Sequence, residues 1–528
     1  MPLMGSLYVG SSGLRTSQNA LNTTAHNMSN MGTQGYTRQQ VLLGTMEYTT
    51  LSVNPKSVAN QQTGMGVYYS KVRQVRDEFL DKRYRQEFGR SNFYQVTSET
   101  FNEVENLLGE MDGVAFQGIY EDLWDSVQEL SKDPGNAITQ GMLVQYSSVF
   151  LTRAEAIYEG LTKYQDNLNT QIKLAVDTIN DYGKQLFELN DRIRRIEGGG
   201  LETANDLRDV RNQILDELAG YVDITYQENA DSSVTVRIEG NDFIGRNSLY
   251  EIGLQEDVAT GYYTPFWIIN AKASLDRDGN TVYDIDGARL FDLKRPISSD
   301  INTDVGKLKS MLLARGDHHA THEDLNDATP EDLEYYNKVI SPSVLMNIEA
   351  EFDRLIHNVT TKMNEVLNST KYENQWELFV EKAEDGGRFI LGNIQVNPLL
   401  MEEPSLLSFK KRDGQIDHEK ADALKEVFTR EDEDNRLNPT AQKRTTLEKY
   451  YEDLVSQVAN YAYVAYGIYE SQDVTVESAD AAREQIVGVS SDEELTNMIM
   501  YQNAYNASSR YINVIDEMLE HIINTLAV

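Results

Sequence analysis

A long heptad seam between residues 136 and 197 constrains this chain more than any other feature of its sequence. Apolar side chains recur there at three- and four-residue spacing over five heptads, at Leu161, Tyr164, Leu168, Ile172, Ala175, Ile179, Tyr182, Leu186, Leu189, Ile193 and Ile196. Such spacing is typical of a helix that packs along its length against other helices. Three glycines at 198–200 predict its end. The chain is therefore predicted to contain a rod of long helices.

Further helical patterns lie on both sides of this seam. They run from Val72, Val75 and Phe79 to Leu107, from Leu123 to Leu130, through "NDLRDVRNQILDELAG", from Leu345 to Val366, and from Leu447 to Ile468. Between them, "VDITYQ", "SVTVRI", "LYEIGL", "YYTPFWIIN" and "TVYDID" are short, β-branched and aromatic, as strands are. The predicted fold is mainly α, with long helices and coiled coil built from both chain ends and an inserted β-rich domain in the middle.

This pattern predicts three domains. Residues 1–38 with 490–528 form a terminal coiled-coil domain. Residues 39–220 with 343–489 form a helical rod domain that includes a mixed segment at 373–440. Residues 221–342 form the inserted β-rich domain, on the outside of the rod.

The two ends of the chain carry complementary apolar patterns. Leu7, Leu14 and Leu21 recur every seven residues beside a face of small residues. At the other end, three- and four-residue spacing links Leu495, Met498, Gln502, Tyr505, Ile512, Leu519 and Ile523. A seam as thin as the first cannot hold a lone helix. The two ends are therefore predicted to pair with each other, as an intramolecular coiled coil, or with copies of themselves.

Composition excludes several classes of protein. The net charge of −36 repels nucleic acid and anionic membranes, so neither is an expected partner. The absence of cysteine removes disulfides, thiol catalysis and cysteine metal sites. No apolar run is long enough to span a bilayer, and the N-terminus does not resemble a signal peptide.

Two segments contain residue types that bind metals. His318 and His322 lie four residues apart, but the following Glu323 is not between them as in a zinc-protease motif, so a solvated loop is favoured over a zinc site. "DRDGNTVYDIDG" lacks the glycine and the glutamate of a calcium-binding EF-hand loop, so a hairpin turn is favoured. No catalytic, cofactor or metal site is predicted.

Four separated stretches resemble the axial proteins of the bacterial flagellum, and most closely the hook-associated family at the junction of hook and filament. "GLRTSQNALNTTAHNMSNMGTQGYTRQQV" resembles the N-terminal axial motif and contains Asn27, Asn30, Gly35, Tyr36, Arg38 and Gln39. "NDLRDVRNQILDELAGYVDITYQ", "GKLKSMLLARGD" and "GVSSDEELTNMIMYQNAYNASSRYINVIDEMLEHI" supply the remaining similarity. The chain has Gln34 where the family usually has proline, and its entry to the last helix also differs.

The resemblance implies a structural, non-enzymatic component of the flagellum that self-assembles at the hook–filament junction. Its implied partners are copies of itself in a homo-oligomer ring, the hook protein, the second hook–filament junction protein, and a flagellar export chaperone at the C-terminal helix. The implied location is extracellular, after secretion through the flagellar type III export apparatus without a cleaved signal peptide. The terminal segments are then expected to be disordered in the isolated chain and helical after assembly.

Two alternatives stay open at this point. The chain could be another flagellar axial protein, such as the hook protein or the second junction protein. It could also be a secreted metal-dependent hydrolase on a flagellin-like frame, with the histidine segment as its site.

Overall fold

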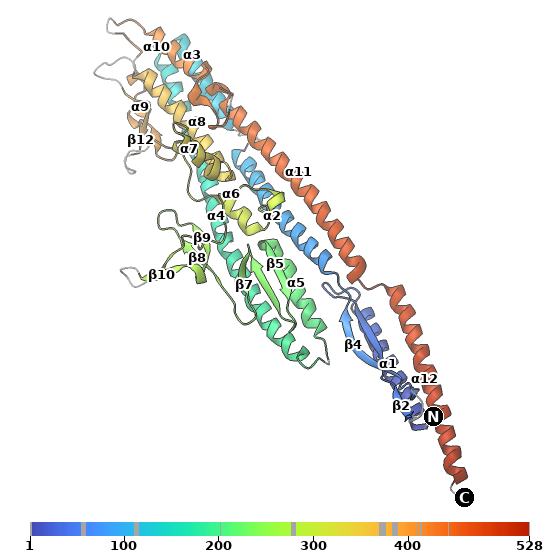
Figure 1. Cartoon of the computed structure of the whole chain (residues 1–528). Helices are drawn as coiled ribbons and strands as arrows, with labels where there is room; N and C mark the ends of the chain where they lie inside the picture. The colour runs from blue at the N-terminus through green and yellow to red at the C-terminus, as the bar shows by residue number, and fades with distance from the viewer. Residues whose placement is uncertain are drawn as a thin grey trace.

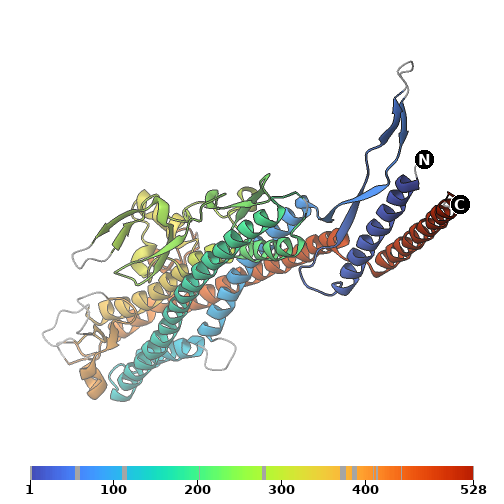
Figure 2. The same ribbon diagram turned by 90° about the horizontal axis from the view of Figure 1, so that it is seen from below.

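The chain forms an elongated helical body that continues at one end into a narrower arm (Figure 1). The computed structural model describes residues 3–53, 60–109, 116–200, 202–275, 281–368, 376–382, 389–407, 409–411, 414–441 and 443–526. Both termini lie in the arm, whereas the middle of the chain lies in the body (Figures 1 and 2).

Five long helices build the body. They are α2 (Glu78–Leu108), α3 (Phe116–Lys132), α4 (Ala137–Glu197), α8 (Val344–Leu367) and α11 (Leu447–Val487). The rings of Phe116, Phe150, Phe352 and Tyr451 meet in its core, with centroids of Phe116 5.4, 5.3 and 4.7 Å from the other three. Each of these helices was predicted from its apolar spacing, and each is confirmed.

The expected strands lie in the middle of the chain, against α4. Helix α5 (Asn205–Tyr221) leads into β5 (Ile224–Glu228), β6 (Val234–Ile238) and β7 (Asn241–Ile244), which form one antiparallel sheet. Two antiparallel pairs follow, β8 (Ile252–Glu256) with β9 (Tyr263–Trp267), and β10 (Lys272–Leu275) with β11 (Thr281–Asp284). The fold class is therefore confirmed as mainly α with an inserted β-containing region.

Asparagine side chains of α4 hold these strands to the helix. The Asn190 amide donates to the Val234 carbonyl at 2.8 Å, and its oxygen accepts the Val234 N–H at 3.0 Å. Asn180 makes the same two bonds to the backbone of Ile252, at 2.8 and 3.0 Å. The buried Phe243 ring also lies against Gly183 of α4. The insert thus shares one apolar core with the body, so deleting 221–300 would uncover α4.

Short elements complete the body. They are η1 (Ile268–Asn270), η2 (Ser299–Ile301), α6 (Lys307–Arg315), η3 (His322–Leu325), α7 (Pro330–Tyr335), η4 (Tyr336–Ile340), β12 (Phe379–Glu381), β13 (Ile394–Val396), α9 (Pro398–Glu402), η5 (Pro404–Leu406), α10 (His418–Thr429) and η6 (Glu433–Asn435). The last six of these make the mixed segment that the sequence predicts before α11.

The arm consists of two helices and a long hairpin. Its elements are α1 (Leu3–Ser29), β1 (Gln39–Thr45), β2 (Thr49–Val53), β3 (Asn60–Thr63), β4 (Val67–Gln74) and α12 (Ser491–Leu526). Strand β1 pairs with β4, and β2 with β3, so the hairpin stands out beside α1 (Figure 2). Both terminal helices are formed in the single chain, which differs from the disorder expected before assembly, because α1 and α12 cover part of each other's surface.

The hairpin corrects one prediction. Residues 39–74 were expected in the helical rod, with Val72 and Val75 inside a helix, yet Val72 pairs with Val41 in the β1–β4 ladder. Alternating β-branched and aromatic residues favour a strand there. Helix α2 begins later, where the Asp77 side chain accepts the Phe79 N–H at 2.8 Å and caps it. Among the described helices, none is long and apolar enough to cross a membrane.

Candidate assembly site: the terminal arm and its elbow

Helices α1 and α12 run in opposite directions and approach each other closely at two glycines. A Cβ atom on Gly10 would lie 2.8 Å from Cγ1 of Ile512, and one on Gly13 would lie 2.7 Å from Oγ of Ser508. Both distances are shorter than any normal van der Waals contact, so larger side chains would push the helices apart. The small residues on this face of α1 therefore allow α12 to approach closely.

The buried face of α1 is not the leucine seam that the sequence predicted. Its most buried residues are small and mostly polar, namely Ser6, Gly10, Ser12, Thr16, Ser17, Ala20, Thr24 and Asn27. Leu7, Leu14 and Leu21 lie at its edges and are only half-buried. The small-residue face beside the leucines is therefore the buried one, because close approach of two helices requires small residues at the centre of the contact.

The predicted stripe on α12 divides in a similar way. Met498, Tyr505, Ile512 and Leu519 are half-buried on the side of α1, whereas Leu495, Gln502 and Ile523 are exposed. The most buried apolar residue of this helix is Ile515, which is 4% exposed. Helix α12 also extends beyond the start of α1 (Figure 1), and this leaves Ile523 without cover in the single chain.

A second apolar stripe on α12 lies beside the face that contacts α1. We call it the outer stripe, and its large residues are Met500, Tyr511, Val514, Met518 and Ile522. Tyr511 lies at its edge, where its ring also reaches Gly10 of α1. These side chains are between 39% and 53% exposed. Their spacing places them on one side of the helix, apart from the face that contacts α1. Sequence reasoning missed this stripe as a separate face, although its three- and four-residue spacing was visible.

The predicted motif residues meet at the elbow, the segment 27–39 that joins α1 to β1. Asn27 is 1% exposed, and its side chain bridges the turn. Its Oδ1 accepts the Tyr36 hydroxyl at 2.7 Å and the Gln39 N–H at 3.0 Å, while its Nδ2 donates to the Gln39 carbonyl at 2.8 Å. The structure thus brings Asn27, Tyr36 and Gln39 together, as the shared motif suggested.

Two more motif residues shape the turn itself. Gly35 has φ of +77°, a left-handed conformation that favours glycine. The Asn30 side chain donates to the His26 carbonyl at 3.0 Å, across the last turn of α1. Helix α1 therefore ends at Ser29, within the motif.

Arg38 ties the elbow to the start of α12. Its backbone N–H donates to the Val487 carbonyl at 2.9 Å, and its guanidinium lies 2.8 Å from Glu494 Oε1 and 2.7 Å from Glu493 Oε2. The Glu494 side chain is 3% exposed, so it depends on Arg38 for its charge balance. The acidic first turn also suits the positive end of the α12 dipole.

Polar contacts also join the elbow and the end of β4 to the body. Arg76 donates to Thr37 Oγ1 of the elbow at 3.3 Å and pairs with Asp81 of α2 at 2.8 Å. The Gln74 amide donates to Asp209 Oδ1 of α5 at 2.7 Å. Burial raises the pKa of Asp209 to about 6, and burial together with nearby carboxylates raises the pKa of Tyr36. A cavity of about 890 Å³ lies between the turn, α2, α5 and the end of α11. The arm therefore meets the body through polar contacts around an open space.

The histidines of this segment pair with carboxylates. His318 pairs with Asp317 at 2.7 Å and with Asp324 at 3.4 Å, and the first of these contacts chiefly raises its pKa to about 10. His322 Nδ1 donates to Asp353 Oδ2 at 2.7 Å, and its ring stacks on His357. Within the described part of the chain, no group of three or more His, Asp or Glu residues is placed to share an ion.

The acidic "DRDGNTVYDIDG" stretch joins two paired strands. Strands β10 and β11 are antiparallel, with Leu275 opposite Thr281, so the predicted hairpin is confirmed. The possible calcium ligands Asp276, Asp278 and Asn280 lie outside the described residues.

Family models match three parts of the chain. The model of the flagellar hook-associated protein FlgK helical domain matches residues 101–370. The C-terminal model of flagellar basal body rod FlgEFG proteins matches residues 485–525, and the flagella basal body rod protein model matches residues 7–37. The last two matches coincide with α12 and with α1 plus its turn.

Individual relatives match almost the whole chain. Flagellar hook-associated protein 1 of Bacillus subtilis (strain 168) is 27% identical over 98% of this chain and 97% of its own length. Flagellar hook-associated protein 1 of Escherichia coli (strain K12) is 24% identical over 97% of this chain and 98% of its own length. The solved flagellar hook junction protein FlgK from Burkholderia pseudomallei aligns with a TM-score of 0.40 and 14% identity, over 58% of this chain and 47% of that one. Because the first family model covers half of its length, the chain belongs to the family of flagellar hook-associated protein FlgK, structural proteins of the hook–filament junction.

Proposed function

We propose that the chain forms a homo-oligomeric ring between hook and filament, and that the outer stripe of α12 makes the contacts between copies. The observation that supports this is the pair of apolar faces on one helix. One face packs on α1, and the other leaves five large apolar residues 39–53% exposed. A continuous exposed apolar stripe on a long helix is typical of an interaction surface.

The arm is also suited to the proposed partners at either side of the ring. The hook protein and the second hook–filament junction protein would contact the ring through neighbouring arms and bodies. An export chaperone would cover the C-terminal part of α12, including Ile523, before assembly. We further propose that the role is structural rather than catalytic, and that the chain reaches the outside of the cell through the flagellar type III export apparatus.

Each proposed domain has a separate role in the assembly. Residues 1–38 with 490–528, together with the hairpin at 39–74, would form the assembling terminal domain, 75–220 with 343–489 the rod, and 221–342 the outer insert. Within the terminal domain, the motif residues Asn27, Asn30, Gly35, Tyr36, Arg38 and Gln39 would set the angle between arm and body rather than contact a neighbour.

Substitutions on the outer stripe test this function. A double variant, Val514→Asp and Met518→Asp, places two charges on the outer stripe, and both positions are exposed in the single chain. We expect normal folding by circular dichroism and loss of incorporation into isolated flagella, because burying the charges between copies costs several kcal/mol. The matched control, Asn513→Asp with Asn524→Asp, adds the same charge on the polar face of α12 and should incorporate normally. Normal incorporation of the stripe variant would refute the proposed interface.

A further inference from the structure

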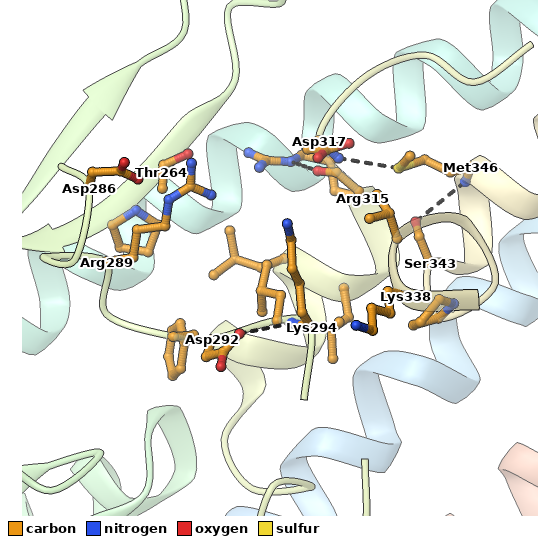
Figure 3. A pocket seen from close by; sticks show the side chains of 18 of the residues that line it. Thr264, Asp286, Arg289, Asp292, Lys294, Arg315, Asp317, Lys338, Ser343 and Met346 are labelled. Carbon is orange, nitrogen blue, oxygen red and sulfur yellow. Dashed lines mark hydrogen bonds between the residues drawn. The ribbon is translucent and has the colours of Figure 1, made fainter. Parts of the chain in front are cut away.

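A cavity of about 470 Å³ opens between the insert and the body, far from the arm. It lies between β9 with the loop that follows β11, on one side, and α6 with the start of α8, on the other (Figure 3). The family assignment and the assembly function do not use this cavity. Its volume is in the range of sites that hold small organic ligands.

A buried guanidinium lines the cavity without a carboxylate partner. Arg315 is 3% exposed. Its Nη1 donates to Asn169 Oδ1 at 2.6 Å and to the Tyr263 carbonyl at 3.1 Å, and its Nε donates to the Gly316 carbonyl at 2.9 Å. All three acceptors are neutral, and no ion pair links Arg315 to another described residue. Burial accordingly lowers its pKa to about 10.

Two further cations line the same cavity. Figure 3 shows the side chains of Arg289 and Lys294 directed into the space beside Arg315. Neither forms an ion pair with any residue that the structure describes. Three carboxylates, Asp286, Asp292 and Asp317, also line the cavity. Asp317 pairs with His318 at 2.7 Å, Asp292 accepts the Lys294 backbone N–H at 3.2 Å, and a fourth cation, Lys338, pairs with Glu334. Three of the cations at this cavity thus have no ion pair to a described residue, in a chain of net charge −36.

The apolar part of the lining sets a second requirement on the ligand. Phe291, Leu312, Leu313, Val339 and Met346 line the wall of the cavity. An inorganic anion would satisfy the cations but leave this wall in contact with water. A ligand that fills the cavity must therefore carry both a negative group and an apolar body, so that each covers its matching surface.

We propose that this cavity binds a small organic carboxylate with an aromatic or aliphatic body. The carboxylate would lie among Arg289, Lys294 and Arg315, and the apolar body would lie against the wall formed by Leu312 and Met346. Guanidinium groups match a carboxylate with two parallel hydrogen bonds, and the buried Arg315 would gain a carboxylate in direct contact with its guanidinium.

Calorimetric titration of the full chain tests this site. The probes are phenylacetate, 4-phenylbutyrate and octanoate, each compared with its neutral amide. At least one acid should bind saturably to one site, and its amide should bind at least about tenfold more weakly, since one charge-assisted hydrogen bond is worth about that factor. No saturable binding by any of the three acids, or equal binding of acid and amide, would overturn the proposal.

Variants locate the binding to this cavity. Lys294→Gln and Arg289→Gln change exposed residues, so the fold should be kept, and thermal melting would verify this. Each should weaken binding of the acid by about tenfold without changing binding of the amide. Lys163→Gln removes an exposed charge from α4 outside the cavity and should leave binding unchanged. Wild-type affinity in both cavity variants would show that the acid binds elsewhere and would overturn the proposal.

Discussion

In the body α2 lies beside α11, and in the arm α1 lies beside α12, but the two pairs bury different kinds of side chain. Along α11 in the body, the residues packed toward the core include Tyr451, Leu454 and Val458, all at most 1% exposed. Along α1 in the arm, the buried face is serine, threonine, glycine and alanine. Equal lengths of helix therefore provide very unequal amounts of apolar burial.

This difference separates the body, which buries enough apolar surface to fold by itself, from the arm, which would bury most of its apolar surface only on assembly. Burying a large apolar side chain contributes about 1.5–3 kcal/mol, whereas a serine or glycine contributes little. The arm also leaves the large side chains of the outer stripe 39–53% exposed, where another molecule can cover them. The α1–α12 contact is thus built from small residues, whereas the exposed large residues of α12 are available to bind another molecule.

The largest expected effect is a loss of stability in the body. Phe352→Ala removes a ring that is fully buried against Phe116 and Tyr451, and should lower the free energy of unfolding of the body by about 3–5 kcal/mol. Urea unfolding followed by tryptophan fluorescence measures this. Tyr511→Ala, which removes a ring from the outer stripe, should leave the unfolding of the body unchanged. Equal losses in the two variants would contradict the separation of the two regions.

A smaller effect should loosen the elbow. Arg38→Ala leaves the buried Glu494 carboxylate without its cation, which should cost about 1.5–3 kcal/mol of arm stability. Amide hydrogen exchange should then speed up in α1 and α12 while α4 and α8 remain protected. Arg15→Ala, an exposed arginine of α1, is the control and should change neither region. Faster exchange throughout the body would show that the elbow is part of the same cooperative unit.

The glycine contact between the two terminal helices can be tested with a matched pair. Gly10→Val places a side chain where Ile512 already lies, and overpacking of this kind costs about 1–3 kcal/mol. Gly5→Val makes the same change where no atom lies within 4 Å. We expect reduced helicity of the arm and reduced incorporation into flagella for the first variant only. Equal behaviour of the two variants would mean that α1 and α12 do not pack closely in solution.

The smallest expected effect is the change in the stability of the body for each unit of pH. Burial raises the pKa of Glu349 to about 8 and that of Glu351 to about 7, both on α8. From about pH 5 to pH 8 the folded body therefore holds protons that the unfolded chain has released, so stability should fall as pH rises, by at most about 1.4 kcal/mol per unit for each group. Urea midpoints at pH 6 and 8.5 measure the slope. The variant Glu349→Gln with Glu351→Gln should flatten it, and an unchanged slope would assign the effect to other groups.

The sequence predicted the long helices well because their periodicity is local and repeated. The hairpin at 39–74 was missed because Val72, Val75 and Phe79 fit a helical spacing that pairing with β1 overrides. Asn180 and Asn190 look like solvent-facing positions of a helix, and only the folded insert shows the backbone that they bind.

The candidate site was predicted in part for similar reasons. The motif residues Asn27, Tyr36 and Gln39 are close in sequence, and the structure places them in one turn. The pairing of Arg38 with Glu494 joins residues 456 positions apart, which no local pattern reveals. Which face of α12 contacts α1 also depends on side-chain size in a partner helix, so the outer stripe emerged only from the packed pair.

The most direct test compares amide hydrogen exchange in the isolated chain and in assembled flagella. We predict that residues 500–522 of α12 exchange quickly in the isolated chain and slowly in flagella, because the outer stripe becomes covered, while α4 and α8 exchange slowly in both. Limited proteolysis of the isolated chain should agree by removing both ends before the body is cut. Strong protection of residues 500–522 in the isolated chain, unchanged on assembly, would contradict the account.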